Sequence, residues 1–102
     1  MDMETGEIFI DDGMKISDLK LVLTSCACPE QYDVFFNKTQ VGYLRLRHGC
    51  FTVEVPDFGG EYVYSANPSG DGQFEDYERE FYINQALWAI CENFNKKENF
   101  GN

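Results

Sequence analysis

The strongest constraint on the fold is a pair of β-rich segments, 41–47 and 50–55, separated only by His48-Gly49. Two residues ending in glycine between such segments are typical of a tight β-hairpin. This loop pairs Arg47 with Cys50, Leu46 with Phe51, Arg45 with Thr52, Leu44 with Val53, and Tyr43 with Glu54. Opposed residues share a face, so one face is apolar and the other mixed. A slip of one residue would mix the two sets, which makes this register the prediction.

A second hairpin precedes the first, because residues 32–36 are also β-rich and residues 38–40 suit a turn. On the apolar face this turn predicts Phe36 beside Gly42, Val34 beside Leu44 and Tyr32 beside Leu46. On the other face it predicts Asp33 across from Arg45 and Phe35 across from Tyr43. After Gly59-Gly60, residues 61–66 are expected to form a fourth strand.

The hydrophobic period then changes to that of a helix. The apolar positions that recur at helical spacing are Ile83, Ala86, Leu87, Ile90 and Phe94. We expect this helix to begin near Phe74 and to end near Asn95. About 20 helical residues span ~30 Å, which is enough to cover a small sheet on one face.

For the start of the chain the sequence pattern fits two structures. Ser17-Asp18 favours a short helix, although the alternation of Leu19, Leu21 and Leu23 suits a strand nearly as well. We expect a loose acidic arm over 1–14, one α+β domain over 15–97 and a frayed tail over 98–102. The predicted fold is thus an antiparallel meander of three to four strands with a long C-terminal helix packed on one face.

The charge is strongly negative: 18 acidic against eight basic residues give −10 over 102 residues. Residues 54–80 hold eight of the acids and only one arginine. Such a field repels phosphate backbones and anionic lipid, which disfavours direct binding to nucleic acid or to a membrane surface. No apolar run approaches the ~20 residues of a membrane span, and the acidic N-terminus is unlike a secretory signal. We expect a cytoplasmic protein with reduced cysteines.

The segment from Asn67 to Glu78 resembles the calcium loop of EF-hand proteins. By that resemblance Asn67, Ser69, Asp71 and Glu78 would be side-chain ligands, with Gly72 at the sharp turn. The family's first position is usually Asp, and no entering helix is predicted before this loop. The alternative is a polar loop whose acids favour the start of the helix.

Catalytic and metal-binding patterns are sparse. Cys26, Cys28, His48 and Cys50 have the chemistry for zinc, but each pair has one intervening residue where zinc sites usually have two or more. The single histidine lies in the predicted turn, and no phosphate-binding loop with its lysine is present. We expect neither an enzyme nor a bound cofactor.

Two surfaces are therefore candidates for binding another protein. One is the acidic start of the helix, with Glu75, Asp76, Glu78 and Glu80. The other is the mixed sheet face, with Phe35, Tyr43, Arg45 and Arg47. The leading hypothesis is a non-enzymatic binding or regulatory protein that engages a basic protein. In size and charge the chain resembles small acidic proteins that imitate DNA. Its oligomeric state and the identity of any partner are left open.

Overall fold

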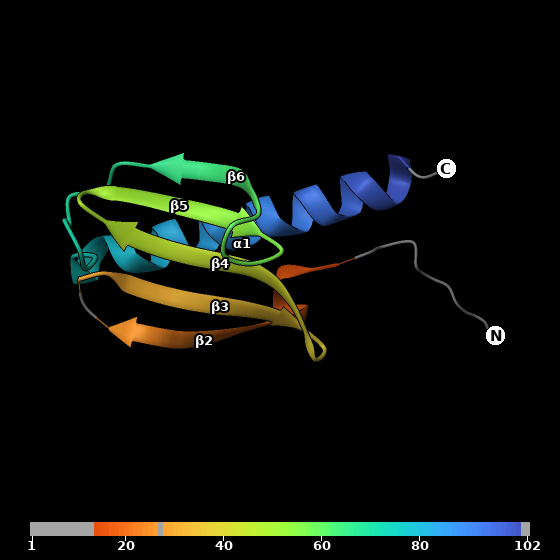
Figure 1. Cartoon of the computed structure of the whole chain (residues 1–102), viewed down its shortest axis with the longest axis horizontal. Coiled ribbons are helices and arrows are strands. Elements are labelled where there is room, and N and C mark those ends of the chain that lie inside the picture. Colours follow the sequence, from red (N-terminus) through yellow and green to blue (C-terminus); the bar gives the residue numbers. More distant parts are fainter. Residues whose placement is uncertain (1–13, 27, 101–102) are drawn as a thin grey trace.

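The computed structural model describes residues 14–26 and 28–100 and contains one antiparallel sheet and one long helix (Figure 1). The sheet has five strands in chain order: β2 (Leu19–Cys26), β3 (Glu30–Phe36), β4 (Thr39–Arg47), β5 (Cys50–Val55) and β6 (Glu61–Ala66). Helix α1 (Asp76–Phe100) lies across one face, and a 3-10 turn, η1 (Ile16–Asp18), precedes β2. The α+β meander is confirmed, with one strand more than predicted.

The β4–β5 hairpin has the predicted register at every pair, from Arg47 with Cys50 to Tyr43 with Glu54. His48 and Gly49 have φ values of 54° and 72°. Positive φ at both positions gives the loop the twist that the flanking strands need.

The predicted β3–β4 register is wrong by two residues, since Val34 pairs with Gly42 and Tyr32 with Leu44. The loop is residues 37–38, where Asn37 has a φ of 59°, and the shift between Val34 and Phe35 leaves Val41 bulged. A shift of two residues preserves the sheet face of each side chain. Tyr32 and Val34 are therefore buried, as the pattern predicted.

The short helix expected after Ser17 is also wrong. Only η1 is helical, where the Asp18 carboxylate accepts the Lys15 N–H at 3.1 Å, and the chain then enters the eight-residue strand β2. Leu19 and Leu21 lie opposite Phe36 and Val34 on β3. The period-two pattern decides the outcome because β3 offers an edge to pair with.

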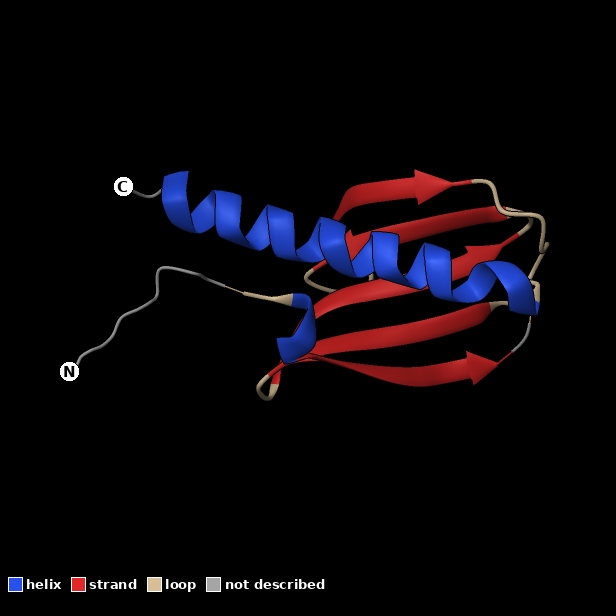
Figure 2. Cartoon of the chain, turned by 180° about the vertical axis from the view of Figure 1, so that it is seen from behind, coloured by secondary structure: helices blue, strands red, loops and turns tan. Residues whose placement is uncertain are grey.

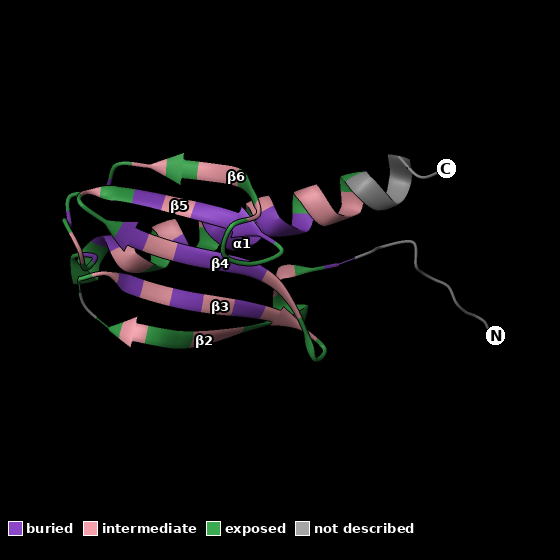
Figure 3. Ribbon diagram, in the orientation of Figure 1, coloured by how far each residue is buried: buried purple, intermediate pink, exposed green. Residues whose placement is uncertain are grey.

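The core lies between the sheet and α1 (Figure 2), and the buried residues run along the middle strands (Figure 3). The sheet and α1 approach closely at Gly42, because a Cβ placed there would overlap Ile90 Cδ1. Met14, assigned by sequence to the arm, is only 2% exposed, and its N–H donates to Asn95 Oδ1 at 2.8 Å. Residues 1–13 of that arm lie outside the described residues. Helix α1 starts two residues later and ends five residues later than predicted.

Helix α1 does not cover the sheet evenly. It packs mainly against β4, β5, β6 and η1, and β2 lies along the edge away from it (Figure 2). Leu23 of β2 is 52% exposed as a result. Among the described residues, no helix combines the length and apolar content that crossing a bilayer demands.

Candidate functional site

The start of α1 is anchored to the sheet by an ion pair between the partly exposed Arg79 and the buried Glu30. Arg79 Nε donates to Glu30 Oε2 at 2.8 Å, and the N–H of Phe74 donates to Glu30 Oε1 at 2.9 Å. The Tyr32 hydroxyl donates to the same carboxylate. Arg79 also donates to the exposed Asp76 at 2.8 Å. A residue of β3 thereby holds the first helical turn in place.

This network keeps Glu30 ionised. Burial by itself raises the pKa of Glu30, but hydrogen bonds from Arg79, Tyr32 and the Phe74 amide outweigh it and leave the pKa below its usual value. Burial, followed by the hydrogen bond to Glu30, raises the pKa of Tyr32 to about 12. Neither group therefore titrates near neutral pH, and the network is structural.

Glu78 makes a second anchor at the same turn. It is only 6% exposed, and its carboxylate accepts the N–H groups of Ser69 at 2.9 Å, Gly70 at 2.8 Å and Glu75 at 3.0 Å. Burial raises the pKa of Glu78, but these three backbone donors lower it below its usual value overall. A carboxylate one turn into a helix commonly caps it in this way.

These contacts bear on the EF-hand-like loop. The Asn67 amide donates to the carbonyl of Gly49 at 3.2 Å, and the Ser69 hydroxyl accepts from Tyr77 at 3.0 Å. Calcium needs several oxygen atoms converging on one point. In this fold, Glu78 would have to release its backbone donors to become a ligand. Calcium binding by this loop stays the untested alternative to a binding surface.

The predicted cysteine and histidine set lies at one end of the sheet. The loop before β3 meets the helix-start loop there, since Cys28 N–H donates to Gly72 O at 2.9 Å. Cys26, Cys28 and Cys50 are exposed, and His48 lies in the adjacent hairpin loop. Within the described part of the chain, no three His, Cys, Asp or Glu residues are placed to hold a metal ion.

The outer sheet face is partly covered by the chain itself. Tyr43, Arg45 and Arg47 belong to this face, as predicted from the β4–β5 register. Phe35 was predicted to lie across from Tyr43, but it pairs with Gln40 instead. Tyr43 is buried because the ring of Phe58, in the β5–β6 loop, lies 5.6 Å from its own. The Arg45 guanidinium lies 5.9 Å from the same Phe58 ring. The sequence pattern contains no signal that this loop folds back over the strands.

The loop is held by a buried carboxylate. The N–H of Gly59 donates to Glu54 Oε1 at 2.7 Å, whereas Glu54 Oε2 is buried and has no hydrogen-bond partner among the described residues. Among the described residues of this face, Arg47, Cys50, Phe58 and Tyr62 remain exposed. Much of the predicted sheet surface is therefore already occupied from within the chain.

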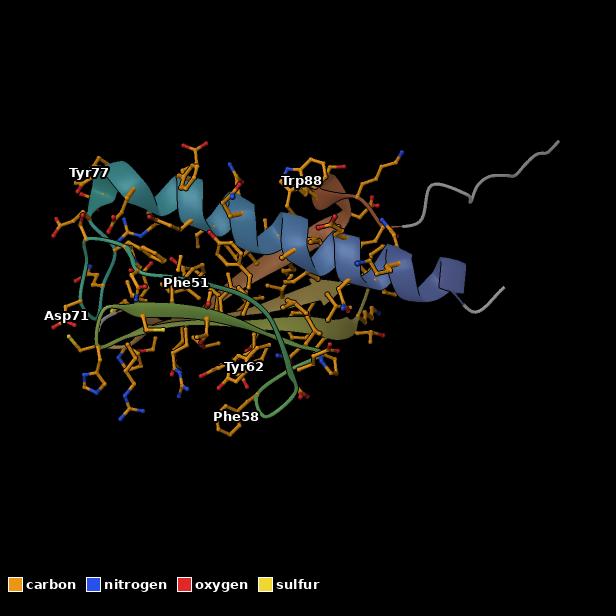
Figure 4. All side chains as sticks on the ribbon, turned by 90° about the horizontal axis from the view of Figure 1, so that it is seen from above. Phe51, Phe58, Tyr62, Asp71, Tyr77 and Trp88 are labelled. Atoms are coloured by element: carbon orange, nitrogen blue, oxygen red, sulfur yellow. The ribbon has the colours of Figure 1, made fainter. Side chains whose placement is uncertain are left out.

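The opposite side of the molecule is more open. Tyr77 is 78% exposed and Phe81 57% exposed, one turn apart on α1, and Trp88 is 63% exposed two turns further. Figure 4 shows Tyr77 and Trp88 on the side of α1 away from the sheet, with Phe58 and Tyr62 beyond the other sheet face. Helical phasing of the sequence predicted the buried stripe, but the aromatic residues on the outer stripe were missed.

Acidic side chains flank these aromatic residues. Glu75, Asp76 and Glu80 are exposed, unlike Glu78. Asp76 and Glu80 are one turn apart and form a row beside that of Tyr77 and Phe81. We call Glu75, Asp76, Tyr77, Glu80 and Phe81 the helix-start surface.

Besides a hollow of about 370 Å³ near Ile90 and Phe94, two hollows adjoin α1 in the described part of the chain. The larger, about 740 Å³, lies between residues 14–17 and the helix around Trp88 and Asn95. The smaller, about 310 Å³, lies between β2 and the start of α1. Its lining combines apolar and charged side chains from three elements: Leu21, Tyr32, Asp76, Arg79, Glu80 and Ile83.

Comparison with protein-family models, with curated proteins and with solved structures finds no match. We therefore argue the function from the exposed charges, aromatic side chains and hollows of the described residues.

Proposed function

We propose that the protein is a non-enzymatic binding protein that engages a basic protein through the helix-start surface. The observation that carries the proposal is the exposure of Tyr77 and Phe81 beside the exposed carboxylates of Asp76 and Glu80. Aromatic residues are enriched at the centres of protein interfaces, and surrounding charges select the partner and speed its approach.

The anchors described above support this role. The Arg79–Glu30 and Glu78 contacts fix the first turn of α1, so its outward side chains are presented from a rigid element. A preorganised surface loses less conformational entropy on binding. The chain's net charge of −10 adds long-range attraction toward a basic partner.

The test is retention of basic proteins from host-cell lysate on the immobilised full chain. We expect retention that weakens as salt is raised, because exposed charge pairs are screened. Retention should fall sharply in E75Q/E80Q. The matched control, D57N/D71N, removes the same amount of charge from exposed residues outside this surface and should retain the wild-type partners.

Equal retention by the two variants would show that net charge alone attracts basic proteins, and would contradict a specific surface. A third variant, Y77S/F81S, separates the aromatic contribution. It leaves the charge unchanged and should lower retention even at low salt.

A further inference from the structure

Strand β2 is an open edge of the sheet. Within the described part of the chain it pairs only with β3, so its outer row of backbone N–H and C=O groups is available. Such an edge is a template for another extended segment. The register shift between Leu23 and Ser25 marks a bulge, which confines regular pairing to residues 19–23.

The core-facing side of this edge is apolar and only partly covered. Leu21 and Leu23 lie opposite Val34 and Tyr32, which are buried, and so point to the same side as the core. Leu23 is nevertheless half exposed because α1 lies over the other strands. If another strand paired with β2, its side chains on the core-facing side would lie over these leucines.

The hollow beside Leu21 is acidic. Asp76 and Glu80 line it from the helix, and Glu30 lies buried behind Arg79. Arg79, which also lines this hollow, pairs with Glu30 and Asp76, and Glu80 adds a further carboxylate to the lining. Arginine and lysine suit such a site, because their aliphatic stems cover apolar surface while their charged ends reach carboxylates.

The charge also discriminates between possible occupants. Residues 1–13 carry five acids and no basic residue, so the same sign of charge opposes their docking here. A second copy would bring its own acidic helix start toward this one. Because residues 1–13 and a second copy would both bring negative charge to this edge, a basic segment from another protein is the favoured occupant.

Resting on the proposed function, we propose that β2 binds an extended basic segment of the partner, which adds to the sheet as a sixth strand. Alternate residues of the segment are arginine or lysine; their stems lie on Leu21 and Leu23, and their charged ends reach Glu80 and Asp76. The intervening residues face the outer side near Lys20, where polar side chains fit.

The experiment titrates the ¹⁵N-labelled full chain with an eight-residue peptide of alternating threonine and arginine, followed by amide NMR. We expect shift changes at residues 19–23 and Glu80. Two further peptides carry N-methyl groups on either all arginine or all threonine amides. In an extended peptide only one of these two sets of amides faces β2 and donates hydrogen bonds to it. The peptide methylated on that set should therefore bind at least tenfold more weakly, and the other peptide should keep its affinity.

Leu23→Lys should also weaken binding at least tenfold, because it places a cation under the arginine stems. The control Tyr62→Lys makes a similar charge change at an exposed site on the other edge strand and should bind like wild type. Since Leu23 is half exposed, the variant is expected to fold, which its amide spectrum verifies.

Equal binding by both N-methylated peptides, or shifts confined to Tyr77 and Phe81, would overturn strand addition but leave the proposed function intact. Absence of peptide binding at low salt would also overturn strand addition. So would sedimentation showing that wild type dimerises and Leu23→Lys does not, because a second copy would then occupy the edge. The lysate experiment judges the proposed function independently of these results.

Discussion

Replacing Glu78 by Gln isolates one carboxylate that the fold uses as a helix anchor. The Glu78 carboxylate accepts Ser69 N–H on one oxygen and both Gly70 and Glu75 N–H on the other. Glutamine keeps the shape but turns one oxygen into an NH₂ donor. At least one of the three backbone donors then faces another donor, and the remaining hydrogen bonds lose their charge.

The expected cost is about 2–3 kcal/mol, combining one lost hydrogen bond with the weakening of the others. For a domain of this size that lowers Tm by roughly 10–20 °C. The assay is urea and thermal unfolding followed by circular dichroism. Glu75→Gln, an exposed neighbour in the same turn, is the control and should change stability by less than about 0.5 kcal/mol.

The pH dependence provides a second check. Because the pKa of Glu78 is lowered in the folded state, its contribution is present above the ordinary carboxyl value of 4.5 and is lost as pH falls through the folded pKa. The gap between wild type and E78Q should therefore close in acid. The anchoring role of Glu78 would be refuted if E78Q were as stable as Glu75→Gln at pH 7. It would also be refuted if the loss of stability in E78Q depended on added calcium.

Three further predictions concern the core and the loop. Gly42→Ala should cost about 1–3 kcal/mol by crowding Ile90, and Ile90→Val should recover part of it; strictly additive costs in urea unfolding would contradict the close contact. Burial raises the pKa of Cys91 from 9.0 to about 11, so the free energy of unfolding should fall as pH rises through that window. In Cys91→Ala the fall should begin only above pH 10, where tyrosines whose pKa is raised in the fold, Tyr32 among them, begin to contribute. Millimolar calcium should leave the amide shifts of Gly70–Glu78 unchanged while Glu78 keeps its backbone donors; shifts with raised Tm would establish the calcium site.

The local pattern was sufficient wherever a loop of fixed geometry set the register. His48-Gly49 specified the β4–β5 pairing completely because both positions adopt positive φ. The same reasoning missed the β3–β4 register, because the shorter loop shifts the pairing by three residues and the bulge at Val41 takes back only one. Alternation identified the buried face in both hairpins, since a shift of two residues does not move a side chain between faces.

The candidate site depended more on tertiary contacts. Glu75, Asp76, Glu78 and Glu80 look alike in sequence, yet Glu78 is buried on backbone amides and the other three are exposed. Tyr43 looks like a surface residue by alternation but is covered by Phe58. Both outcomes follow from loops that fold back, and such contacts have no periodic signal.

By itself the sequence determined the fold class, the apolar sheet face, the central hairpin and the concentration of acids near the helix start, because alternation, helical period and turn chemistry are local properties. The tertiary structure alone decided that the segment after Ser17 is a strand, that α1 leaves this strand uncovered, and which acids face solvent. Those outcomes depend on how a helix of given length crosses a sheet of given width. That crossing places Leu21 and Glu80 on the lining of one hollow, although they are 59 positions apart in the chain.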